Sequence, residues 1–249
     1  MTNGCLLFHQ GWTDIINCLA LINYYSKKYF NIILLVREDS APLINYYIKQ
    51  FENVTPHYYS KDILENAINQ LADRYSKQGL ELLFHGYYDD WRTDIYFNKM
   101  KKNLPKTFFV EKFYITYGID YIERVNSFDF IRDDKIENIA YENFIAKNSN
   151  KYILYHEDIN RNIIIDKSKF DKEYTWVDLN NLSEIFLDCI LILEKARSIH
   201  CIDSVWAALA YQLDAAYGTL KNIPIEIICK RGYREMYSSP IKLINWKIL

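Results

Sequence analysis

The chain has 249 residues, half of them hydrophobic and a quarter charged, and its formal net charge is −2. This composition excludes global disorder and fits one large domain or two small ones. The weak net charge argues against a nucleic-acid binder, and it leaves only local, peripheral contact with a membrane open. Five scattered cysteines form no CxxC pair, which indicates free thiols rather than a zinc site or a disulfide framework. The sequence shows neither a signal peptide nor an apolar run of about 18 residues, so we expect a cytoplasmic protein.

Short apolar runs alternate with segments of helical periodicity near the start of the chain, which predicts a parallel α/β sheet. The expected strands are 5–9, 32–36, 54–58 and 80–85, and the expected helices are 14–27, one that begins near Ser40, and 61–76.

The pattern weakens between residues 86 and 150, where only 90–101 and 135–147 favour helices, and it becomes regular again from residue 151. The strands expected there are 152–156, 175–177, 198–202 and 225–229, and the helices are 181–196 and 204–213. We therefore predict an α/β fold of two Rossmann-like halves facing a central cleft. The first domain would cover residues 1–110. The second would cover 111–249, with its tail packed back on the first half.

Four histidines lie at the ends of apolar runs, namely His9, His85, His156 and His200. Ligands of parallel sheets bind beyond the carboxyl ends of the strands, so these side chains mark a candidate ligand edge. The alternative is that each histidine simply closes a strand. No motif adjoins His85, and we assign it to the alternative.

The segment HQGWTDII follows the first expected strand. Gly11 permits a tight turn, Thr13 is the expected N-cap of the helix, and Asp14 falls in its first turn. Asp14 either stabilises the helix dipole or acts as a general base on a hydroxyl. The segment has no GxGxxG pattern, so it is not a dinucleotide fingerprint.

The segment HCIDSVWAALA resembles the first in layout, with a strand, a polar pair and a helix. Asp203 precedes Ser204, which is the expected N-cap of an alanine-rich helix. The start of that helix is suited to a phosphate group. The alternative is ordinary capping by the serine hydroxyl.

Two further segments carry cations close to a strand end. In YHEDINR, Arg161 could bind a phosphate in bidentate fashion beside His156 and Asp158, or the charges could form a mutually paired, solvated loop. In the tail KRGYREMYSSP, Arg234 could neutralise an anionic ligand or lie on the surface. Arg124, in an aromatic middle segment, is expected among solvated charges.

These motifs resemble those of GT-B glycosyltransferases, in particular the ADP-heptose heptosyltransferase-like group and related uncharacterised sugar transferases of bacteria and large viruses. The group's GxGD loop is similar to Gly11-Trp12-Thr13-Asp14, and its DTGxxHxA motif is similar to Asp203-Ser204-Val205 with Ala210. Val205 replaces the motif's glycine, and Ala208 replaces its histidine. The resemblance implies that Asp14 is the catalytic base and that the donor diphosphate lies near Ser204.

The expected function is therefore transfer of a sugar from a nucleotide-sugar donor to a hydroxyl of a glycan or glycolipid. The reaction would be inverting, with no metal and no cofactor, an acceptor-binding first domain and a donor-binding second domain. The residues expected to bind substrate or donor are His9, Gly11, Trp12, Thr13, His156, Asp158, Arg161, His200, Asp203, Ser204 and Arg234. The alternatives are a nucleotide-sugar hydrolase or epimerase, and a non-enzymatic sugar- or nucleotide-binding module.

Overall fold

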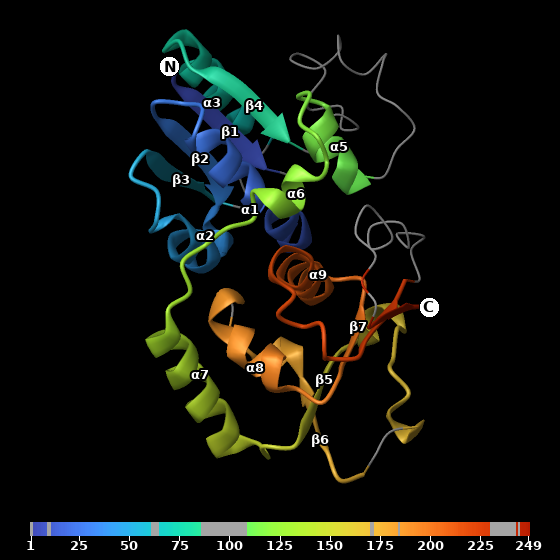
Figure 1. Cartoon of the computed structure of the whole chain (residues 1–249). Helices are drawn as coiled ribbons and strands as arrows, with labels where there is room; N and C mark the ends of the chain where they lie inside the picture. Colours follow the sequence, from blue (N-terminus) through green and yellow to red (C-terminus); the bar gives the residue numbers. More distant parts are fainter. Residues whose placement is uncertain are drawn as a thin grey trace. The chain divides into compact units, whose positions relative to one another are not determined.

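The chain forms two compact α/β units, Met1–Phe130 and Ile131–Leu249 (Figure 1). The computed structural model describes residues 2–8, 11–60, 65–85, 109–169, 172–183, 185–229, 243 and 245–249. The helix expected at 90–101 lies outside these residues, as do His9 and Arg234. No helix among the described residues is long and apolar enough to cross a membrane.

The first unit is built on a four-stranded parallel sheet with strand order β3-β2-β1-β4. Its strands are β1 (Gly4–Phe8), β2 (Ile32–Arg37), β3 (Val54–Tyr59) and β4 (Glu81–His85). Its helices are α1 (Trp12–Ser26), α2 (Ala41–Ile48), α3 (Glu65–Lys77), α5 (Phe109–Ile115) and α6 (Glu123–Asn126). Every residue of β1 is buried, as a central strand covered on both faces requires.

The segment that follows α5 belongs to the first unit because it packs on α1. The Tyr114 hydroxyl donates to the carbonyl oxygen of Asn17 at 2.6 Å, and the Asn23 amide donates to the carbonyl oxygen of Ser127 at 3.0 Å. The first unit therefore extends to Phe130, beyond the boundary at residue 110 that the sequence suggested.

The second unit is built on a five-stranded parallel sheet with strand order β6-β5-β7-β8-β9. Its strands are β5 (Tyr152–His156), β6 (Thr175–Asp178), β7 (Ile199–Ile202), β8 (Ile225–Ile228) and β9 (Trp246–Ile248). Its helices are α7 (Asp134–Lys147), α8 (Ile190–Lys195) and α9 (Val205–Tyr217). Each strand expected from the sequence is present, and the two parallel sheets confirm the α/β fold class.

One expectation for the second unit is corrected by the structure. The helix expected at 181–196 is broken, because Phe186 adopts φ 61° and ψ −47°, outside the right-handed helical region. The chain there forms the 3-10 turns η6 (Leu179–Asn181) and η7 (Leu187–Cys189) before α8. The end of the chain forms β9 beside β8.

Candidate functional site

In the first unit, the loop after β1 leads directly into α1. Gly11 is the N-cap of this helix, with φ −79° and ψ 142°, and its carbonyl oxygen accepts from the Ile15 amide at 2.9 Å. The expectation that Thr13 caps the helix was wrong, because Trp12 and Thr13 already lie in its first turn. All three residues are half-buried beside the carboxyl end of β1.

The carboxylate of Asp14 folds back toward the start of its own helix. A Cβ atom placed on Gly11 would lie 2.7 Å from Asp14 Oδ2, which is closer than van der Waals contact allows. Gly11 therefore leaves room for this position of the carboxylate, and its own backbone angles are ordinary extended ones. Asp14 itself is half-buried.

A buried arginine packs on α1, and the sequence did not identify it. Arg124 was expected among solvated charges but is only 1% exposed, and it donates to Tyr121 Oη and Asn17 Oδ1 at 2.6 Å each. Burial raises the pKa of the Cys18 thiol, the carboxylate of Asp14 raises it further, and the Arg124 guanidinium opposes the rise. The charges of Asp14 and Arg124 therefore both influence the Cys18 thiol of α1.

In the second unit, the polar pair after β7 leads into α9. Ser204 is the N-cap of α9 with an extended backbone, and its side chain makes no capping hydrogen bond. The residue is 8% exposed, and among the described residues its buried hydroxyl has no hydrogen-bond partner. The first turn of α9 carries no acidic residue, so its own side chains leave the positive end of the helix dipole unneutralised. Ser204 is therefore the N-cap of α9, as expected. Its hydroxyl, which has no partner among the described residues, lies beside the first-turn amides of the helix.

His156 lies on the neighbouring strand at the same edge of the sheet. It is the last residue of β5 and stands in register with Cys201 of β7, three residues before Ser204. Burial lowers the pKa of His156, although a hydrogen bond with Asn180 and nearby carboxylates, including that of Asp178, oppose the shift. Its buried Nδ1 has no hydrogen-bond partner in the described part of the chain. The carboxyl ends of β5 and β7 therefore each present a buried polar atom that the fold leaves unused.

Asp178 and Asn180 were missed as candidates at this edge. Both follow the carboxyl end of β6, and the strand-end argument used for the histidines would have found them. Asp178 Oδ1 accepts from the Asn180 backbone amide at 2.9 Å, which fixes the turn that carries Asn180 toward His156.

Three residues of the second unit do not join the Ser204 edge as expected. Asp158 pairs with the Arg161 backbone amide at 3.1 Å and with Arg161 Nε at 3.2 Å, which is the mutually paired loop given above as the alternative. His200 is not at a strand end, because β7 continues to Ile202. Its ring nitrogens contact Ser198 Oγ at 2.9 Å and Glu226 Oε2 at 3.0 Å.

His85 belongs to the core of the first unit. It is fully buried, and burial lowers its pKa to about 3. The Tyr25 hydroxyl lies 3.1 Å from His85 Nε2, and His85 Nδ1 contacts the carbonyl oxygen of Phe113. Its assignment to the structural alternative is confirmed.

No cluster of three or more His, Cys, Asp or Glu side chains among the described residues is arranged to hold a metal ion. The candidate groups are the Gly11–Asp14 turn in the first unit and, in the second unit, His156, Asp203 and Ser204. The chemistry offered is a carboxylate in one unit, and in the other a helix start with a hydroxyl and an imidazole.

The two parallel Rossmann-like sheets, with polar loops at the carboxyl ends of their strands, define the GT-B class of fold. The glycosyl transferase family 9 protein from Veillonella parvula DSM 2008 matches 100% of this chain and 85% of its own, with a TM-score of 0.56 and 11% identity. The E. coli ADP-heptose lps heptosyltransferase II matches 100% of this chain and 90% of its own, with a TM-score of 0.58 and 10% identity. These likenesses confirm the resemblance to heptosyltransferase-like proteins at the level of the fold. No protein-family model matches the sequence, and a comparison with curated proteins gives no match.

Proposed function

We propose that this chain is a glycosyltransferase that moves a sugar from a nucleotide-sugar donor to a hydroxyl of a glycan or glycolipid. The observation that carries the proposal is the buried hydroxyl of Ser204, which has no partner among the described residues and lies at the start of α9. A buried hydroxyl without a partner is costly, so such a group is commonly reserved for a ligand. Helix N-termini favour phosphate groups, and a nucleotide-sugar carries a diphosphate.

In this proposal the second unit binds the donor. The first-turn amides of α9 and the Ser204 hydroxyl donate to the diphosphate, and Asp203 lies beside them. The unused Nδ1 of His156 provides one more polar contact on the neighbouring strand. These groups stabilise the negative charge that develops on the departing nucleoside diphosphate, so this site requires no metal ion for that role.

The first unit provides the base. Asp14 accepts the proton of the acceptor hydroxyl while its oxygen forms a bond to the anomeric carbon and the bond from that carbon to the diphosphate breaks. Attack opposite to the leaving group inverts the configuration at this carbon. The E. coli protein of similar fold is named for ADP-heptose, which supports a nucleotide-sugar as the donor class.

The proposed function is tested with a panel of UDP, GDP, ADP, CMP and TDP in a thermal-unfolding assay. A nucleotide at one hundred times its dissociation constant stabilises the folded state by about 2.7 kcal/mol, which is readily measured. The sugar derivative of the best nucleotide is then incubated with and without glycan acceptors. We expect a glycoside only in the presence of an acceptor. Release of free sugar at the same rate without an acceptor would instead establish a hydrolase, and tight binding without turnover would establish a binding module.

A second test exploits the close approach of Gly11 and Asp14. In Gly11→Ala the new methyl group displaces the Asp14 carboxylate, because Asp14 Oδ2 lies only 2.7 Å from the position that the methyl carbon would take. We expect the transfer rate to fall at least tenfold. Stability should change by no more than about 1 kcal/mol, because alanine is a poorer N-cap than glycine, whereas loss of the glycine's freedom in the unfolded chain adds about 0.4–1 kcal/mol. Rates and urea unfolding of the parent and variant check this. If Gly11→Ala lowers the rate of Asp14→Asn by the same factor as that of the parent, it does not act through the carboxylate.

A further inference from the structure

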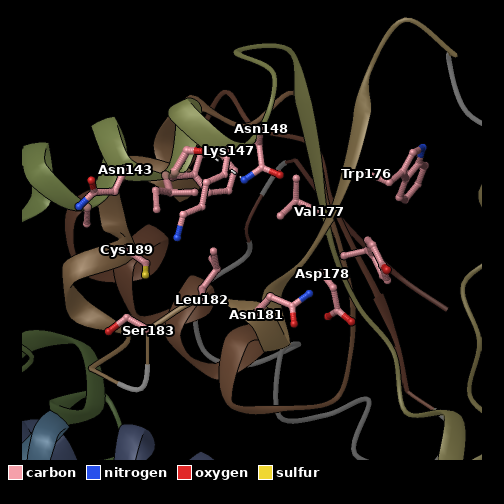
Figure 2. A pocket seen from close by; sticks show the side chains of 14 residues that line it. Asn143, Lys147, Asn148, Trp176, Val177, Asp178, Asn181, Leu182, Ser183 and Cys189 are labelled. Carbon is pink, nitrogen blue, oxygen red and sulfur yellow. Dashed lines mark hydrogen bonds between the residues drawn. The ribbon is translucent and has the colours of Figure 1, made fainter.

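The second unit contains a pocket, and none of the residues assigned above to donor binding forms part of its lining. It has a volume of about 490 Å³ and lies between the last turns of α7 and the segment from β6 through η6 (Figure 2). β6 is an edge strand of its sheet, so this pocket is at the border of the unit. His156, Asp203 and Ser204 do not line it.

The pocket has an apolar floor and a polar rim. The floor is formed by Phe144, Val177 and Ile192, of which Phe144 and Ile192 are at most 6% exposed. The rim contains the carboxamides Asn143 and Asn181 and the cation Lys147. A mostly apolar lining with a few directed polar groups is typical of sites for small molecules, which range over about 300–1,000 Å³.

The polar side chains of the rim have no bonding partner in the part of the chain that the structure describes. Within the described residues, the side chains of Asn143, Lys147 and Asn181 make no hydrogen bond and no ion pair. Other lysines of the same unit do pair, as Lys167 does with Glu157 at 2.9 Å and Lys247 with Glu226 at 2.9 Å.

The rim groups are also spread along the pocket. Figure 2 shows Asn143 at one end of the pocket and Asn181 nearer its middle, with the amine of Lys147 directed into the space between them. The pocket's carboxylate, that of Asp178, lies beyond Asn181 in this view and accepts from the Asn180 amide. A ligand in the part of the pocket between Asn143 and Asn181 would therefore meet the positive charge of Lys147 with an amide on either side, and the carboxylate of Asp178 would lie beyond Asn181.

We propose that this pocket binds a sugar unit that carries one anionic group, a carboxylate or a phosphate. A carboxamide both donates and accepts hydrogen bonds, which suits the hydroxyl groups of a sugar ring. The ammonium group of Lys147 is a compact point charge that suits a carboxylate or a phosphate. The apolar floor accommodates the C–H face of the ring. His156, Asp203 and Ser204 do not line this pocket, and the proposal does not depend on sugar transfer by the chain.

The proposal is tested by calorimetry on the full chain with glucuronate, glucose 6-phosphate, glucose and inorganic phosphate as probes. We expect the two charged sugars to bind at least tenfold more tightly than glucose and than inorganic phosphate. Comparison of glucuronate with glucose 6-phosphate decides which charged group the pocket prefers. Absence of binding by both charged sugars overturns the proposal. Equal affinity for glucose 6-phosphate and inorganic phosphate overturns it as well, because the pocket would then hold a bare anion.

Variants locate the binding in this pocket. Lys147→Met should weaken the charged sugars at least tenfold and leave glucose unchanged, whereas Asn181→Ala should weaken all three sugars. Lys135→Met is the matched control, because Lys135 is an exposed lysine of α7 outside the pocket, and it should bind like the parent. Parental affinity in Lys147→Met would overturn the proposal. All three variants should bind the nucleoside diphosphate with the parental affinity. A result that overturns this proposal therefore leaves the proposed donor site standing, and the reverse also holds.

Discussion

Asp14→Asn should lower the rate of sugar transfer by a factor of about 10²–10⁴, which is the usual contribution of a general base. The amide has nearly the shape of the carboxylate but cannot accept the proton of the acceptor hydroxyl at neutral pH. Because Asp14 lies in the unit that does not bind the donor in our proposal, the affinity for the nucleoside diphosphate should stay at the parental value. Initial rates and calorimetry of the parent and the variant measure both quantities.

A matched control distinguishes the role of general base from the alternative role of Asp14, which is stabilisation of the helix dipole. Asp134 is an exposed acidic residue in the first turn of α7, so Asp134→Asn removes the same kind of helix-end charge away from the candidate site. Each substitution should lower the free energy of unfolding by about 0.3–1 kcal/mol. Only Asp14→Asn should lower the transfer rate. A parental rate in Asp14→Asn would remove Asp14 from the role of base.

Ser204→Ala should have opposite effects on ligand affinity and on stability. Loss of the hydroxyl removes one hydrogen bond to the charged diphosphate, and affinity should fall about 10- to 100-fold, corresponding to about 1.5–3 kcal/mol. The free energy of unfolding should stay constant or rise by about 1 kcal/mol, because the buried hydroxyl has no partner among the described residues and its removal relieves a desolvation cost. Calorimetry with the nucleotide and urea unfolding without it measure the two effects.

Ordinary capping makes the reverse prediction for Ser204, since loss of a capping serine typically costs about 1 kcal/mol of stability. Ser198→Ala is the matched control, because Ser198 is also 8% exposed but its hydroxyl contacts His200 Nε2 at 2.9 Å. That variant should lose about 1 kcal/mol of stability and keep parental affinity for the nucleotide. Parental affinity in Ser204→Ala, together with a loss of stability, would make Ser204 a cap and not a phosphate contact.

The strands of both sheets were predictable because their signal is local. Residues 152–156 are an example. The apolar run has the length of the strand that is buried in the parallel sheet, and charged residues follow it. Helix starts were harder to locate. Thr13 has the side chain preferred at an N-cap, yet the helix already begins at Trp12, and Gly11 is its N-cap.

Contacts between distant segments could not be predicted in the same way. Arg124 lies in a segment of mixed charge and aromatic residues, and only the packing of α6 on α1 buries it beside Asn17. His200 closes an apolar run in the sequence, but it lies inside β7, whose pairing with β8 continues to Ile202 and places the imidazole beside Glu226. In both cases the partner lies at least 26 residues away along the chain.

The sequence by itself determined the alternation of strands and helices, the two Rossmann-like halves, and the polar turns at Gly11–Asp14 and Asp203–Ser204. Each depends on hydrophobic periodicity or on neighbouring residues, which a single chain displays directly. Only the tertiary structure decided which polar atoms the fold leaves unused. The hydroxyl of Ser204 and the Nδ1 atom of His156 are buried without described partners, whereas His200 and Arg161 are paired. A hydrogen bond needs both partners within about 3 Å, and that distance is set by packing between segments far apart in the sequence.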